Sequence, residues 1–115
     1  GYTVTIRGQT LTSLQNASNT ISAIGGTAAS STLASEQFGI RATVSGGTGA
    51  AVSAPYSSPT SYGYSATATT SAVLATGTGA TNTTTYSLRY VANVSALTEA
   101  GTYVANVVYV ATANF

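Results

Sequence analysis

Alternation of apolar residues with small polar ones is the feature that most constrains this chain. In the first alternating run, Tyr2, Val4 and Ile6 are separated by two threonines and followed by an arginine. Successive side chains of a β-strand point to opposite faces, so this period of two predicts a strand with one buried face. A helical period is absent at any length, and we expect at most one weak helical turn, over residues 28–37.

Further runs with the same signature predict more strands, at 38–44, 62–69, 71–76, 84–95 and 101–115. Stretches rich in Gly and Pro, at 45–61 and 76–83, are typical of the turns between strands. Residues 11–26 are expected to form a short strand and a loop. This spacing predicts one all-β domain over residues 1–115, folded as an antiparallel β-sandwich of Ig-like, Greek-key type.

The last run is apolar on both of its faces. If it is a strand, one face carries Tyr103, Val107, Tyr109 and Phe115, and the other carries Val104, Val108 and Val110. Apolar residues on both faces are typical of a strand that is covered on two sides. Two interpretations stay open: a central strand under loops of its own domain, or a strand whose second face is covered by a neighbouring subunit. We expect this run to form a hairpin with residues 86–95.

The start of the chain predicts an incomplete sheet. A sandwich of this type needs about seven strands, fewer are predicted, and the strand at 2–7 has no upstream partner. We therefore expect a strand from a neighbouring subunit to complete the fold, donated by residues 1–7 or 101–115, with the N-terminal segment favoured. The candidate subunit-interface residues are Tyr2, Val4, Ile6, Val104, Val108 and Val110.

Composition excludes most enzyme chemistry. The chain has no Cys, His, Lys or Asp, and its only charged side chains are Arg7, Glu36, Arg41, Arg89 and Glu99. Nucleophile–base pairs and zinc sites are built mainly from the missing residues. Two carboxylates are the minimum for glycoside hydrolysis, but solvated loop side chains are the simpler interpretation of Glu36 and Glu99. We expect no catalytic residues, no cofactor and no metal.

Charge and hydropathy point to the cell exterior. The formal net charge is +1, and scattered arginines do not make a patch for nucleic acid. No apolar run is long enough to span a bilayer. Only 4% of the residues are charged, against about a quarter in ordinary soluble domains. We expect an extracellular or cell-surface protein whose export signal lay upstream and was removed.

Three asparagines fit the acceptor pattern for N-glycosylation, and they are Asn16, Asn82 and Asn93. Asn82 is the best placed of them, because it is expected to lie in a loop. The many Ser and Thr residues are equally candidates for O-glycosylation.

Several segments resemble one group of bacterial proteins. At the start these are Gly-Tyr-Thr-Val-Thr-Ile at 1–6, Leu-Thr-Ser at 11–13 and Gln-Phe-Gly-Ile at 37–40. Towards the end they are Asn-Val-Ser at 93–95, Ala-Gly-Thr-Tyr at 100–103 and Val-Tyr-Val-Ala-Thr at 108–112. The chain resembles secreted surface and filament proteins of candidate-phylum and Gram-positive-like bacteria, and more remotely the WxL surface domains. The resemblance implies a structural or adhesive function.

We therefore expect a structural subunit of an extracellular filament, pilus-like fibre or surface coat, assembled from copies of itself by strand addition. A second hypothesis is a carbohydrate- or cell-wall-binding module, in which Tyr56, Tyr62 and Tyr64 would stack on surface glycans. Packing in the core or at a strand edge is the commoner role of tyrosines in an all-β domain and is the favoured interpretation of these three. A third is a passive spacer domain within a longer surface protein.

Overall fold

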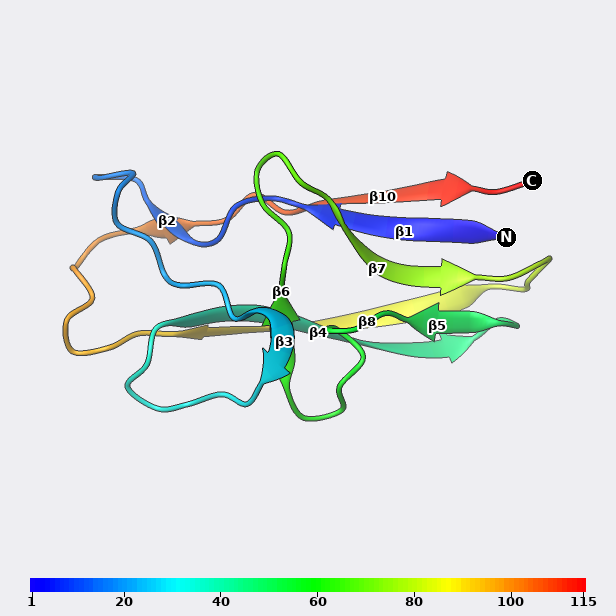
Figure 1. The fold of residues 1–115 in the computed structure, drawn as a ribbon, viewed down its shortest axis with the longest axis horizontal. Coiled ribbons are helices and arrows are strands. Elements are labelled where there is room, and N and C mark those ends of the chain that lie inside the picture. Colours follow the sequence, from blue (N-terminus) through cyan, green and yellow to red (C-terminus); the bar gives the residue numbers. More distant parts are fainter.

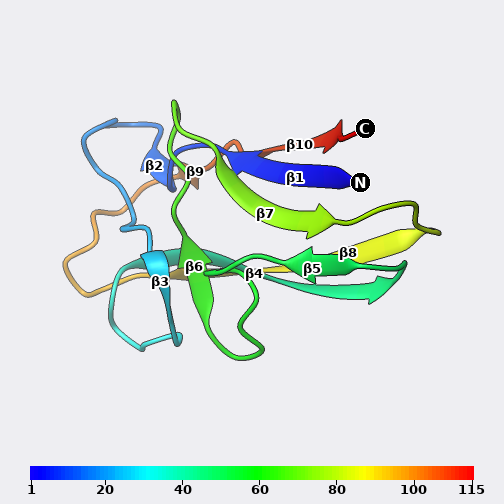
Figure 2. The same cartoon turned by 45° about the vertical axis from the view of Figure 1, so that its right-hand side comes forward.

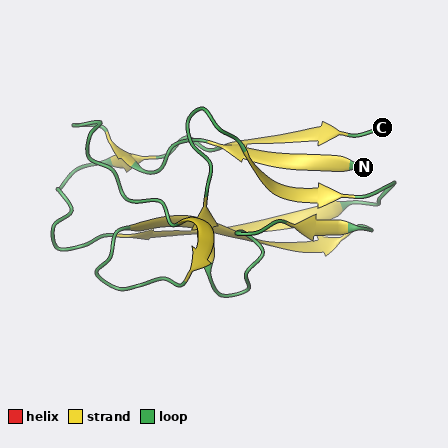
Figure 3. Ribbon diagram, in the orientation of Figure 1, coloured by secondary structure: helices red, strands yellow, loops and turns green.

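The computed structural model describes all of residues 1–115 and contains strands and loops but no helix (Figure 3). The strands are β1 (Tyr2–Arg7), β2 (Thr12–Ser13), β3 (Gly25–Ala29), β4 (Gln37–Gly46), β5 (Ala50–Val52), β6 (Tyr62–Tyr64), β7 (Ala72–Gly77), β8 (Thr84–Asn93), β9 (Tyr103–Val104) and β10 (Val108–Ala113). The all-β prediction is confirmed. The weak helical turn expected over 28–37 is absent, because those residues finish β3 and then form a loop.

Two four-stranded sheets make up the sandwich (Figure 1). The first has the strand order β10-β1-β7-β5 and the second the order β3-β6-β4-β8, while β2 and β9 form a short separate pair. The paired strands are antiparallel throughout. From β4 onwards the chain crosses repeatedly from one sheet to the other, as the sandwich prediction required.

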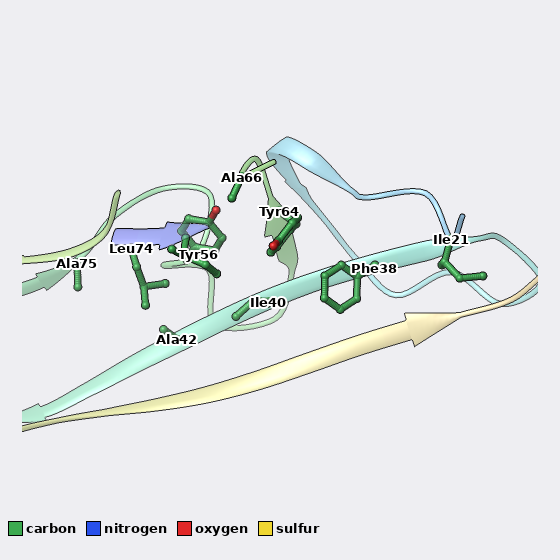
Figure 4. Packing of buried hydrophobic residues seen from close by; sticks show 10 residues of the cluster. Ile21, Phe38, Ile40, Ala42, Tyr56, Tyr64, Ala66, Leu74 and Ala75 are labelled. Carbon is green, nitrogen blue, oxygen red and sulfur yellow. The ribbon is translucent and has the colours of Figure 1, made fainter. Parts of the chain in front are cut away.

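A single core lies between the sheets (Figure 4). Its largest fully buried side chains are Tyr56, Tyr64, Ile6, Ile21, Ile40 and Leu74. The rings of Phe38 and Tyr64 pack edge to face, with centroids 4.9 Å apart. The buried Tyr64 hydroxyl donates a hydrogen bond to the carbonyl of Gly8 at 2.7 Å. The aromatic packing therefore joins β6 to β4, and the hydrogen bond joins β6 to the residue that follows β1.

Gly8 is a position where only glycine fits. Its φ of 151° lies in a region that other residues rarely adopt. A Cβ built there would stand 2.3 Å from the carbonyl oxygen of Asn106. After β1 the chain therefore passes close to the segment that joins β9 to β10.

The C-terminal run differs from the prediction. It forms two strands, β9 and β10, which pair with β2 and β1 and not with β8. The expected hairpin with residues 86–95 is therefore wrong, because the connection after β8 crosses to the other sheet (Figure 2). The central-strand interpretation is also wrong. β10 lies at the edge of its sheet, and all six of its residues are exposed.

The first strand also differs from the prediction. β1 is not an unpartnered edge but lies between β10 and β7, paired on both sides within the chain. Ile6 on this strand has no exposed surface. The missing neighbour of β1 is the last strand of the same chain, so both chain ends lie together at one end of the molecule (Figure 1).

Candidate interaction surface on the open side of the sandwich

Two long edges of the sandwich have no strand beside them. β10 pairs only with β1, and β8 pairs only with β4. An unpaired strand edge presents a row of N–H and C=O groups to any chain that approaches it. These are the longest edge strands of the two sheets, and another strand can be added to the fold at either of them.

Both free edges lie on the same side of the molecule. β5, at the far end of the first sheet, contacts β4 and so closes the opposite side. On the side of the two free edges, β8 faces β1 and β10, and pairs of tyrosines connect them. Tyr2 on β1 meets Tyr86 on β8, and Tyr109 on β10 meets Tyr90 on β8. We call the region between these two edges the open side.

The tyrosine pairs bridge the two sheets. The Tyr2 and Tyr86 hydroxyls are 2.7 Å apart, and their rings pack edge to face at a centroid distance of 6.5 Å. Burial and then the hydrogen bond with Tyr2 raise the pKa of Tyr86 to about 12. Burial and then the hydrogen bond with Tyr90 also raise the pKa of Tyr109. The Tyr86 and Tyr109 hydroxyls therefore keep their protons to a higher pH than an exposed tyrosine does.

A shallow apolar groove opens between the two sheets on this side. Its volume is about 300 Å³, and it is lined by Tyr2, Val4, Thr81, Asn82, Thr84, Tyr86 and Ala111. No charged residue lines it. The side chain of an apolar residue is the kind of group that such a groove accommodates.

The outward groups of β10 follow from the hydrogen bonds at the chain ends. The Asn114 N–H donates to the Gly1 carbonyl at 2.8 Å, and the Gly1 nitrogen donates to the Asn114 carbonyl at 3.1 Å. Hydrogen-bonded and non-hydrogen-bonded pairs alternate along an antiparallel ladder. Counting from this pair along the register, the residues of β10 in non-hydrogen-bonded pairs are Tyr109, Ala111 and Ala113. Their N–H and C=O groups point to the free edge.

The structure separates the candidate interface residues onto different faces. Val4 and Tyr2 point inwards beside the groove, and Ile6 belongs to the core of its own chain. Val110 is paired with Thr5 and Val108 with Arg7, so both valines lie on the outer face of the first sheet. Val108 is 55% exposed and Val110 is 48% exposed. Val104 lies apart from them on β9 and is partly exposed.

The three tyrosines proposed to stack on sugars do not form an exposed surface. Tyr56 and Tyr64 are fully buried in the core, where ring faces meet other side chains and not solvent. Tyr62 is half-buried, and the guanidinium of Arg41 lies over its ring at 5.1 Å. The sequence could not distinguish these core tyrosines from exposed ones, because both kinds occur beside turn residues in β-domains.

The three candidate glycosylation sites differ in their surroundings. Asn16 and Asn82 are exposed in loops. The side-chain nitrogen of Asn93 donates hydrogen bonds to Ser31 and to Gln37 at 2.8 and 2.9 Å. A glycan on Asn93 would displace these contacts, so Asn16 and Asn82 are the accessible acceptors in the folded chain.

The two carboxylates lie at the opposite end of the molecule from the chain termini. Glu36 and Glu99 line one hollow, although they are far apart in the sequence. Glu36 accepts a hydrogen bond from the Thr98 hydroxyl at 2.7 Å, and Glu99 accepts one from the Asn19 amide. Each of the two carboxylates therefore has an uncharged hydrogen-bond donor as its partner.

Comparison of the chain with protein-family models, with characterised proteins and with solved structures found no match. The structure also has no helix with the length and apolar character needed to cross a membrane.

Proposed function

We propose that this chain is a structural subunit of an extracellular filament or surface coat, assembled by adding a strand of one copy to the open side of the next. The observation that carries the proposal is the free edge of β10 beside an apolar groove. A strand added there would satisfy the outward N–H and C=O groups of Tyr109, Ala111 and Ala113. Its side chains would cover the groove on one face and the exposed valines on the other.

The composition of this edge supports the proposal. Soluble monomeric β-proteins protect free edges with charged residues, prolines or bulges. β10 reads Val-Tyr-Val-Ala-Thr-Ala and carries none of these residues, and its pairing with β1 is continuous over six positions. A flat, uncharged edge of this length is a template for pairing with another strand.

The second copy is the partner that this chemistry fits best. Backbone pairing needs only an extended segment of similar character, and β10 is itself such a segment at the end of the chain. The N-terminal segment is less suited to donation, since β1 is paired on both sides and Ile6 is buried. The C-terminal strand has one free side and exposed residues, so it is our candidate for the contact between copies.

Ala111→Lys tests the proposal. Ala111 is exposed and borders the groove, so the lysine is solvated in the free subunit and the fold is retained. In the assembly, the added strand would bury that charge without a partner, which is costly. We expect at least a tenfold rise in the concentration needed for assembly, measured by sedimentation velocity and negative-stain microscopy.

Thr27→Lys is the matched control, because Thr27 is exposed on β3 at the opposite edge of the second sheet. This variant adds the same charge and should assemble like the unmodified protein. Assembly of Ala111→Lys at unchanged concentration, with a normal circular dichroism spectrum, would contradict strand addition at β10.

A further inference from the structure

Two arginines lie directly opposite each other on the outer face of the second sheet. Arg41 on β4 pairs with Arg89 on β8, and the next outward-facing pair along the ladder is Thr43 with Ser87. Together with Pro59, these four residues line a hollow of about 340 Å³. Like charges at directly opposite positions of a sheet destabilise it. The arrangement therefore needs a compensating negative charge, or it lowers stability.

Nothing in the chain supplies that charge. The two carboxylates, Glu36 and Glu99, lie in a different hollow, and the Arg89 side chain makes no hydrogen bond within the chain. The Arg41 side chain donates only to the carbonyl of Pro59, and its Nε is buried without a hydrogen-bond partner. Most of the N–H groups of this pair are left without an acceptor.

The Arg41 side chain is held in place rather than free in solvent. Its guanidinium lies over the Tyr62 ring at 5.1 Å and is anchored by the Pro59 carbonyl. A cation–π contact of this kind fixes the orientation of the group. A preordered guanidinium loses less freedom when it binds an anion. The hollow therefore combines two positive charges, two hydroxyls and one preordered donor group.

We infer that this hollow binds a phosphate group. Two guanidiniums supply two positive charges, and a phosphate monoester, which carries about −1.5 to −2 at neutral pH, roughly matches them. Guanidinium groups bind phosphate oxygens through paired N–H donors. Thr43 and Ser87 also line the hollow, and their hydroxyls are donors for the remaining oxygens. The source is either free phosphate or a phosphate monoester on a sugar. This site lies on a different surface from the open side and does not depend on the assembly proposal.

The chain has three arginines and no other cationic side chain, so each arginine can be followed separately. In isotope-labelled protein at pH 7 and constant ionic strength, the arginine Cζ resonances are followed by NMR during titration with inorganic phosphate. We expect the Arg41 and Arg89 signals to shift and saturate at one common concentration. The Arg7 signal, from a lone arginine on β1, should stay in place.

Two variants complete the test. Arg89→Gln should weaken phosphate binding at least tenfold and, without phosphate, raise the melting temperature by removing the repulsion. Arg7→Gln removes the same charge elsewhere and should leave phosphate binding unchanged. Small linear shifts at all three arginines, or binding that survives Arg89→Gln, would overturn the proposal.

Further titrations identify the source and the specificity. Glucose 6-phosphate that binds more tightly than inorganic phosphate would assign the site to a phosphate monoester. Equal or weaker binding would assign it to free phosphate. Acetate that binds as tightly as phosphate would overturn the assignment, because the site would then be a general carboxylate site that the glutamates of a second copy also fit.

Discussion

At the scale of single residues, tyrosine hydroxyls link the parts of the fold that apolar contacts do not reach. Small Ala, Ser and Thr side chains leave the two sheets with few groups long enough to meet. Tyr64 reaches from β6 to the Gly8 carbonyl, and Tyr86 reaches from β8 to Tyr2 on β1. These hydroxyls work only while they are protonated, so the fold depends on pH in the alkaline range.

Stability should therefore fall as the pH rises from about 10 to about 12. Burial raises the pKa of Tyr64 from 10.0 to about 12, and burial and the hydrogen bond with Tyr2 raise that of Tyr86 to about 12. The unfolded chain releases these protons first, so their contribution is complete below pH 10 and is lost through the folded pKa. Urea unfolding at a series of pH values measures this slope.

Tyr64→Phe tests the assignment of that slope. The variant leaves the buried Gly8 carbonyl without a donor, which should cost about 1–3 kcal/mol of stability at neutral pH. The fall between pH 10 and 12 should also become shallower. Tyr103→Phe, which removes an exposed hydroxyl bonded to the Glu99 carbonyl, should cost less. An unchanged alkaline slope in Tyr64→Phe would show that other groups cause it.

At the scale of elements, the period of two located most of the long strands. β1, β4, β7 and β8 lie where the alternation placed them, to within a few residues. β3 and β5 were missed, because their Gly- and Ala-rich sequences carry the composition of turns. The predicted strand at 62–69 ends at Tyr64, and residues 67–70 form a turn closed by a hydrogen bond from the Thr70 N–H to the Thr67 hydroxyl.

Pairing between strands was the part that local patterns did not reveal. Alternation reports which side chains are buried, but β10 and β1 come together from opposite ends of the chain. The apolar residues on both faces of the C-terminal run predict a strand covered on two sides. The structure places them at an exposed edge. The groove and the Arg41–Arg89 pair depend on such pairings and could not be predicted from the sequence.

Val108→Asp tests the position of β10 at the edge. Val108 is 55% exposed and lies opposite Arg7, so an aspartate there is solvated and has a cationic neighbour. We expect a folded monomer with a stability within about 0.5 kcal/mol of the unmodified protein. Assembly should weaken, because an added strand would pack against this side chain. Unfolding of the variant, seen by circular dichroism, would mean that Val108 is buried and that β10 is not an edge.

At the scale of the whole molecule, the proposed function rests on the strand edges that have no partner within the fold. The subunit is elongated, with extents of 48 × 27 × 19 Å, and along one of its long sides two strands, β8 and β10, each have one edge without a partner strand. Its few charges are kept away from the groove, with the glutamates at the loop end and the arginine pair on an outer face. A chain that leaves an uncharged edge beside an apolar groove is suited to joining copies of itself.

Amide hydrogen exchange of β10, in the free and the assembled protein, tests this account most directly. The N–H groups of Tyr109, Ala111 and Ala113 point to the free edge, while those of Val108, Val110 and Thr112 pair with β1. We predict that the first three exchange rapidly in the monomer and become protected on assembly, while the other three are protected in both states. Assemblies in which the first three amides still exchange rapidly would contradict strand addition at this edge.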